Sequence, residues 1–134
     1  MDPEVAPEAL DRIILQIAIA AMELERAIAD FQNTQFMLAD METDLQSARM
    51  LLYAAAVKVT ENAPDKTKFA AMAKRLATDN GSSIVDRALQ LHGGYGYLQD
   101  YPVERFWRDL RVHSILEGTN QVMRMIVGRE LSRQ

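Results

Sequence analysis

The sequence predicts an all-α fold, an antiparallel four-helix bundle with a short extra helix, formed as one domain over residues 1–134. Two observations support this prediction. Apolar residues recur three and four positions apart along most of the chain, which is the period of a helix with one buried face. No window of strand length alternates between apolar and polar residues, so no β-strand is expected.

Two helices are expected in the first half of the chain. The first runs from about Pro7 to Asp30, and the second, which is longer, from Asn33 to Glu61. The second carries a continuous apolar stripe of Leu38, Met41, Leu45, Ala48, Leu52, Ala55 and Val59. A stripe of this length indicates that one side of the helix packs against the rest of the bundle.

The second half predicts three more helices. Pro64 and Asp65 signal the start of the first, and the glycines after His92 signal its end, with Gly93 or Gly94 expected at positive φ. Its apolar face is expected to contain Phe69, Ala73, Leu76, Asn80, Ile84, Ala88 and Leu91. A shorter helix follows Pro102. The last is expected from about Asn120, with Thr119 as N-cap candidate and an apolar face of Val122, Met125 and Ile126.

Composition and charge exclude several classes of protein. Fifteen Lys and Arg stand against 19 Asp and Glu, with no basic run, so a nucleic-acid-binding surface is not expected. There is no cysteine, hence no disulfide or thiolate chemistry. The longest apolar stretch, residues 13–22, is too short to cross a membrane, which takes about 20 residues. The acidic start "MDPEVAPEAL" resembles neither a secretory signal nor a transit peptide.

A metal site is not expected either. Helical bundles that hold two metal ions use Glu-x-x-His on two helices. The only histidines are His92 and His113, and neither has Glu three residues before it. The eight methionines fall mostly on the apolar stripes, which favours core packing over an adaptable binding surface.

Two motifs each allow two interpretations. In "VERFWRDLR", Glu104 precedes Arg108 by one helical turn, and this spacing favours an ion-paired helix face over phosphate or partner binding. In "LHGGYGY" the glycines end a helix instead of following a strand, so a helix stop is favoured over a nucleotide-binding loop. Exposed glycine backbone still allows a ligand to approach closely, and that second role stays open.

The stretch "SILEGTNQ" contains the strongest candidate for catalysis. Its carboxylate, Glu117, follows Ile115 and Leu116 and precedes Gly118. One interpretation is a solvated turn before the last helix. The other is a general base held against an apolar wall, which requires the carboxylate to be shielded from water.

Two segments resemble a known family. Residues 88–131, "ALQLHGGYGYLQDYPVERFWRDLRVHSILEGTNQVMRMIVGREL", are similar to the C-terminal signature of the acyl-CoA dehydrogenases. Residues 30–56, "DFQNTQFMLADMETDLQSARMLLYAAA", resemble the preceding helix of the same domain. The motifs are most similar to the isobutyryl-CoA and short branched-chain members. This resemblance implies an FAD enzyme that removes two hydrogens from an acyl-CoA thioester.

The resemblance also implies roles for individual residues. Glu117 matches the base that removes the α-proton, and Gly118 matches a position beside the substrate thioester. The positions that match FAD contacts are Thr119 and Gln121, together with Gln90 and Gly94 for the ADP half bound across a subunit interface. The family further implies a homo-oligomer, an electron-transferring flavoprotein as electron acceptor, and a location in the bacterial cytoplasm or the mitochondrial matrix.

The sequence also departs from the family pattern. The N-terminal helical domain and middle β-domain of the family are expected to be absent from this chain. The family's Arg-x-x-Phe-Gly motif, whose arginine binds FAD, aligns with Ala21, Leu24 and Glu25. Two functions are therefore considered: the C-terminal domain of an acyl-CoA dehydrogenase, inactive alone, and a non-catalytic remnant that acts as an oligomerisation or interaction module.

Overall fold

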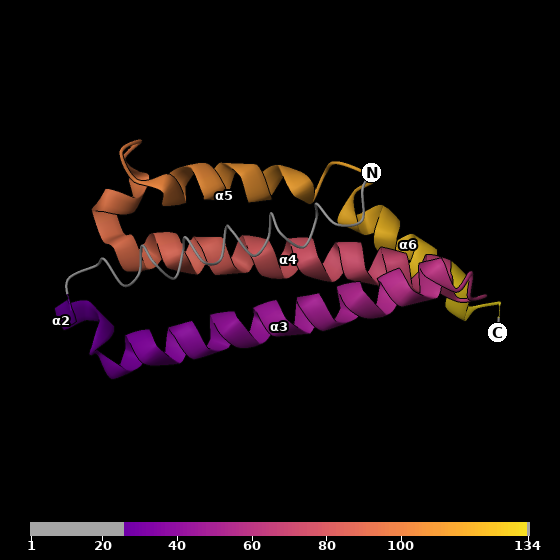
Figure 1. The fold of residues 1–134 in the computed structure, drawn as a ribbon. Coiled ribbons are helices and arrows are strands. Elements are labelled where there is room, and N and C mark those ends of the chain that lie inside the picture. Colours follow the sequence, from indigo (N-terminus) through magenta and orange to yellow (C-terminus); the bar gives the residue numbers. More distant parts are fainter. Residues whose placement is uncertain (1–25, 134) are drawn as a thin grey trace.

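The computed structural model describes residues 26–133, which form the bundle of helices shown in Figure 1. The elements are α2 (Arg26–Ala29), α3 (Gln32–Thr60), α4 (Lys66–His92), the 3-10 helix η1 (Gly93–Tyr97), α5 (Pro102–His113) and α6 (Asn120–Leu131). No strand occurs in this part of the chain. The predicted all-α class is confirmed, and most of the first predicted helix lies outside the described residues.

Helix α4 occupies the centre of the bundle. It packs against α3 and α5, which lie on either side of it in Figure 1, and against α6 and η1. Consecutive long helices run in opposite directions, as the short connections between them require. Because α5 runs back along α4, it delivers the following turn and α6 to the end of the bundle where α4 begins.

The core lies between α3, α4 and α5. Its buried members are Met41, Leu45, Ile84, Val85, Ala88, Val103, Phe106 and Leu110. Most of the predicted stripes of α3 and α4 face this core. Val59 does not, because it lies in the last turn of α3, beyond the reach of α5, and is exposed.

The predicted apolar face of α6 is wrong in part. The buried apolar residue there is Met123, whereas Val122 and Met125 are exposed. Met50, which lies outside the predicted stripe of α3, is exposed on the side that faces away from α4. Core packing therefore explains Met41 and Met123 but not every methionine. Among the described residues, no helix is both long and apolar enough to cross a membrane.

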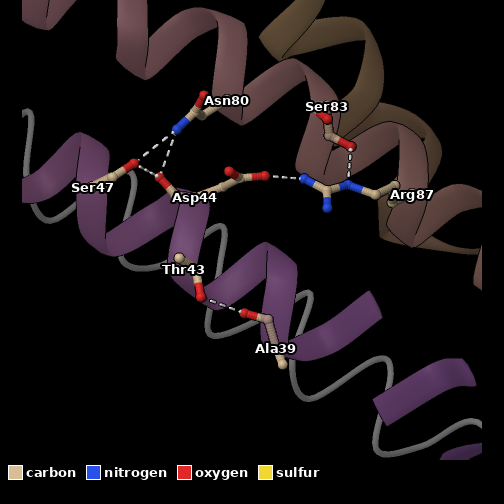
Figure 2. Close-up of polar contacts among 7 residues, drawn as sticks. All are labelled: Ala39, Thr43, Asp44, Ser47, Asn80, Ser83 and Arg87. Carbon is tan, nitrogen blue, oxygen red and sulfur yellow. Dashed lines mark hydrogen bonds and ion pairs between the residues drawn. The ribbon is translucent and has the colours of Figure 1, made fainter. Parts of the chain in front are cut away.

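Polar contacts fix the register of α3 against α4, as Figure 2 shows. The Asn80 amide nitrogen donates to the Asp44 carbonyl oxygen at 2.7 Å and to the Ser47 hydroxyl at 3.1 Å. About two turns further along α4, the Arg87 guanidinium forms an ion pair with the Asp44 carboxylate. At the other end of α3, Lys58 bonds to Asp65 at 2.8 and 2.9 Å, and this hydrogen bond lowers the pKa of the Asp65 carboxyl.

Helix ends follow the residues expected of them. Gly93 ends α4 at φ 56°, as predicted, a conformation that costs glycine little because it has no Cβ. Pro102 begins α5, where a missing backbone N–H has no cost. The Thr119 hydroxyl accepts a hydrogen bond from the backbone N–H of Val122, which confirms Thr119 as the N-cap of α6.

We expect Leu45→Ala to lower the free energy of unfolding by about 2–5 kcal/mol, because it opens a cavity in the core. Leu45 is 2% exposed. Met50→Ala on the outer face of the same helix should change stability by less than about 0.5 kcal/mol. Urea denaturation followed by circular dichroism measures both. Equal losses would show that the core does not lie where the structure has it.

Candidate active site at the α5–α6 turn

Glu117 lies in the turn that connects α5 to α6. Its backbone has φ 58° and that of Gly118 has φ 94°, so two successive residues adopt left-handed conformations. Glycine adopts this region freely, but a residue with a Cβ pays about 1–2 kcal/mol for it. The only other non-glycine residue at positive φ in the described part is Asn62, a type that tolerates it. The conformation of Glu117 must therefore be stabilised by its surroundings.

The side chain of Glu117 lines an open hollow of about 420 Å³ between α3, α4 and α6. The side chain is exposed in this chain. The other residues of the hollow are mostly apolar, namely Val59, Ala70, Ala71, Met123 and Ile126, together with the polar Thr67 and the cationic Lys66 and Lys74. Glu117 thus borders a mostly apolar surface, but its side chain is exposed, whereas the sequence predicts a base that is shielded from water.

Residues of α4 form hydrogen bonds with the turn and with the start of α6. The Lys74 ammonium donates to the backbone carbonyl of Gly118 at 2.7 Å and to the Asn120 side-chain oxygen at 2.9 Å. The same Asn120 oxygen accepts from the Thr78 hydroxyl at 3.0 Å, and the Asn120 amide nitrogen donates to Asp79 at 2.7 Å. Asn120 is 5% exposed, so it is a buried polar residue with its side-chain atoms satisfied.

Thr119 and Gln121 line a different hollow, of about 350 Å³, on another side of the turn. Its lining is mainly polar and includes Asp79 and Ser82 of α4 and two guanidinium groups, those of Arg111 and Arg124. The turn therefore presents Glu117 to a mostly apolar hollow and its neighbours Thr119 and Gln121 to a polar one.

Gln90 and Gly94 lie at the other end of α4. Both are exposed, and a Cβ added to Gly94 would meet nothing within 4 Å. Sixteen residues of helix separate Lys74 from Gln90, which corresponds to roughly 24 Å at 1.5 Å per residue. The structure thus brings Glu117, Gly118, Thr119 and Gln121 together and leaves the other two predicted residues apart from them.

The predicted ion pair on α5 is confirmed. The Arg108 guanidinium bonds to the Glu104 carboxylate at 2.7 Å, and this hydrogen bond raises the pKa of Arg108. Arg111 has a different role, because it donates to the Ser114 hydroxyl at 2.6 Å and lines the polar hollow. Within residues 26–133, no group of three or more His, Cys, Asp and Glu is placed to hold a metal ion.

Sequence reasoning missed Lys74 and the burial of Asn120. Asn120 was expected only as the start of a helix, and its partners on α4 lie more than 40 residues earlier in the chain. A weak signal was available. Lys74 and Thr78 share one face of their helix with Ala71 and therefore interrupt an otherwise apolar surface with polar groups.

The fold and the site together describe an all-α bundle domain with a glutamate in a turn between two hollows. The C-terminal domain family of the acyl-CoA dehydrogenases matches residues 5–132. This chain belongs to that family.

Individual relatives agree with this assignment. The chain is 48% identical over 111 residues to the mitochondrial isobutyryl-CoA dehydrogenase of Dictyostelium discoideum, covering 83% of this chain and 27% of the relative. It is 44% identical over 130 residues to subunit CarC of the caffeyl-CoA reductase–Etf complex of Acetobacterium woodii, covering 97% and 34%. The butyryl-CoA dehydrogenase structure from Megasphaera elsdenii superimposes with a TM-score of 0.85 at 38% identity, covering 98% and 36%.

The chain therefore spans between about a quarter and a third of these relatives' length. The departure from the family pattern at Ala21, Leu24 and Glu25 lies outside the described residues.

We expect Gly118→Ala to destabilise the protein by about 1–2 kcal/mol, because alanine resists the left-handed conformation. The added methyl group would also lie 2.7 Å from the end of Met123, which must shift. The matched control is Gly94→Ala, where φ is not positive and space is open. It should leave stability unchanged or raise it by up to about 1 kcal/mol. Thermal unfolding measures both, and an undisturbed Gly118→Ala variant would contradict the turn geometry.

Proposed function

We propose that this chain is the C-terminal domain of an FAD-dependent acyl-CoA dehydrogenase and that Glu117 is the base that removes the α-proton of an acyl-CoA thioester. The observation that carries the proposal is the left-handed Glu117–Gly118 turn, which sets a carboxylate beside an apolar surface. Membership of the family and the identity to isobutyryl-CoA dehydrogenase support it.

The chemistry explains why such a geometry is useful. A proton next to a thioester carbonyl is weakly acidic, so the base must be held at a fixed place and shielded from water. The Glu117 carboxylate would accept that proton, and Gly118 would lie beside the thioester. When bound, the flavin supplies the acceptor for the hydride that leaves the β-carbon.

The polar hollow fits the proposed cofactor. FAD carries an anionic pyrophosphate and many hydrogen-bonding groups. The hydroxyl of Thr119, the amide of Gln121 and the guanidinium groups of Arg111 and Arg124 offer donors and positive charge for such a molecule. We propose that Gln90 and Gly94, at the other end of α4, contact the ADP half of FAD in a neighbouring subunit.

Because Glu117 is exposed, other domains would have to shield its side chain from water before it could act as a base. The side chain lines an open hollow, and nothing in residues 26–133 covers it. The rest of the relatives' length would have to supply the cover, so we propose that this chain alone is inactive. The electron acceptor we propose is an electron-transferring flavoprotein, since the related A. woodii subunit is named for a complex with Etf.

The experiment is a chimera in which this chain replaces the matching 36% of the M. elsdenii butyryl-CoA dehydrogenase. Glu117→Gln should lower the rate of butyryl-CoA oxidation by about 10²–10⁴, the usual contribution of a general base. Flavin absorbance should be retained, because the amide keeps the size of the side chain. Glu104→Gln on α5 is the control and should leave the rate unchanged. A fully active Glu117→Gln chimera would refute the role of Glu117.

A second function, oligomerisation, is favoured by a specific observation. The side of α3 that faces away from α4 carries large exposed apolar residues, namely Phe36, Met50, Tyr53 and Val57. Apolar patches of this kind mark association surfaces. The altered positions at Ala21 and Glu25 would also suit a remnant that binds no flavin, since an arginine that binds FAD in the family is replaced.

We expect the purified chain to be a homo-oligomer at micromolar concentration, because burial of the outer face of α3 removes apolar surface from water. Light scattering after size exclusion measures the mass. Phe36→Glu with Met50→Glu should shift it toward the monomer, whereas Gln46→Glu on the same face should not. A monomeric wild-type chain would contradict the prediction. Titration with FAD, followed by visible absorbance, then separates the two functions. Binding of FAD supports the dehydrogenase domain, and no binding supports the remnant.

A further inference from the structure

The conformation of Glu117 needs an explanation that its own turn does not supply. A glutamate at φ 58° is strained, and such strain persists only where the surrounding structure fixes it. Within the turn, the backbone N–H of Asn120 donates to the carbonyl of Ser114 at 3.1 Å, which closes the loop. That bond sets where the loop begins and ends but does not orient the peptide groups between.

The contact that acts inside the turn comes from α4. The Lys74 ammonium donates to the carbonyl of Gly118, the residue directly after the base, at 2.7 Å. A second hydrogen bond from the same ammonium, at 2.9 Å, reaches Asn120, where α6 begins. Hydrogen bonds from a charged donor are stronger than neutral ones. A single side chain thus ties the turn and the next helix to a rigid long helix.

Asn120, which accepts a hydrogen bond from Lys74, has further partners on α4. The Asn120 oxygen that accepts from Lys74 also accepts from Thr78, and the Asn120 nitrogen donates to Asp79. Because Asn120 is buried, water cannot replace these partners easily. Asn120 therefore holds the first turn of α6 in register with α4, and Lys74 extends that register to Gly118.

We infer that Lys74, anchored by Asn120, is a positioning residue that fixes the Glu117–Gly118 turn and so aims the Glu117 carboxylate. Lys74 does not touch the reacting atoms in this inference; it acts through the backbone of Gly118. The inference deepens the proposed function and rests on Glu117 being the base. Its geometric part, an ordered turn that depends on Lys74, applies to the chain with no flavin or thioester present.

The first test uses the isolated chain and amide hydrogen exchange measured by nuclear magnetic resonance. Lys74→Met keeps the length of the side chain but removes its donors. It should speed exchange of the backbone N–H of Asn120 about tenfold to a hundredfold, which corresponds to the free energy lost with a charged hydrogen bond. The backbone coupling constant and chemical shifts of Glu117 should move away from values for positive φ. Lys74→Arg, which keeps charge and donors, should restore most of the protection.

Two controls separate positioning from general damage. Lys66→Met removes the other ammonium of the same hollow, which bonds to Asn62 and not to the turn. It should leave the Asn120 amide unchanged. Exchange of the Leu45 amide in α3 should be unchanged in all variants if the core stays folded. Unaltered Asn120 exchange and Glu117 signals in Lys74→Met would overturn the inference, as would an equal effect of Lys66→Met.

The second test uses the chimera with M. elsdenii butyryl-CoA dehydrogenase. A base that is present but badly aimed lowers kcat more than it raises KM. We expect Lys74→Met to lower kcat at least tenfold with KM within about threefold, and Lys74→Arg to recover most of kcat. An unchanged kcat in Lys74→Met would overturn the inference. Failure of the proposed function has a different signature, which is full activity of Glu117→Gln.

Discussion

The hydrogen bond from Lys74 to the backbone of Gly118 links the stable part of this domain to its candidate site. Helix α4 is the element on which the bundle is built, since α3, α5 and α6 all pack against it. The α5–α6 turn is closed by its own bond from the Asn120 N–H to the Ser114 carbonyl. It is joined to α4 through one ammonium group and one buried amide, those of Lys74 and Asn120.

This arrangement divides the molecule into two regions with different physical requirements. Between α3, α4 and α5 the core is apolar, and its residues interdigitate around Leu45, Val85 and Val103. At the start of α6, hydrogen bonds join Asn120 to α4, and hollows lie on both sides of the turn. Close packing provides stability in the first region. In the second region, hydrogen bonds provide direction while the space remains open to a ligand.

The parts of the fold that could be predicted from the sequence are those with local causes. The period of the stripes located α3 and α4, Pro102 located the start of α5, and Gly93 and Thr119 located helix ends. The outer faces could not be predicted in the same way. Val122 and Met125 lie on the predicted apolar face of α6 and are exposed, because periodicity shows that a face is apolar but not whether the described chain covers it.

The candidate site shows the same division. Glu117 stood out because a charge follows apolar residues and precedes glycine, and the resemblance to a family gave it a role. Lys74 was not predicted, because its partner Gly118 lies 44 residues further along the chain. No local pattern records such a contact. The left-handed backbone of Glu117 was equally hidden, since glutamate gives no sequence signal for positive φ.

One residue, Gly118, separates Glu117 from Thr119, and the two face different hollows. Any molecule that displaces Thr119 must rotate the peptide groups that also carry the glutamate. Binding in the polar hollow that moves Thr119 would therefore be thermodynamically linked to the direction of the carboxylate. Such linkage is reciprocal, so whatever binds at the glutamate alters affinity on the threonine side by the same factor.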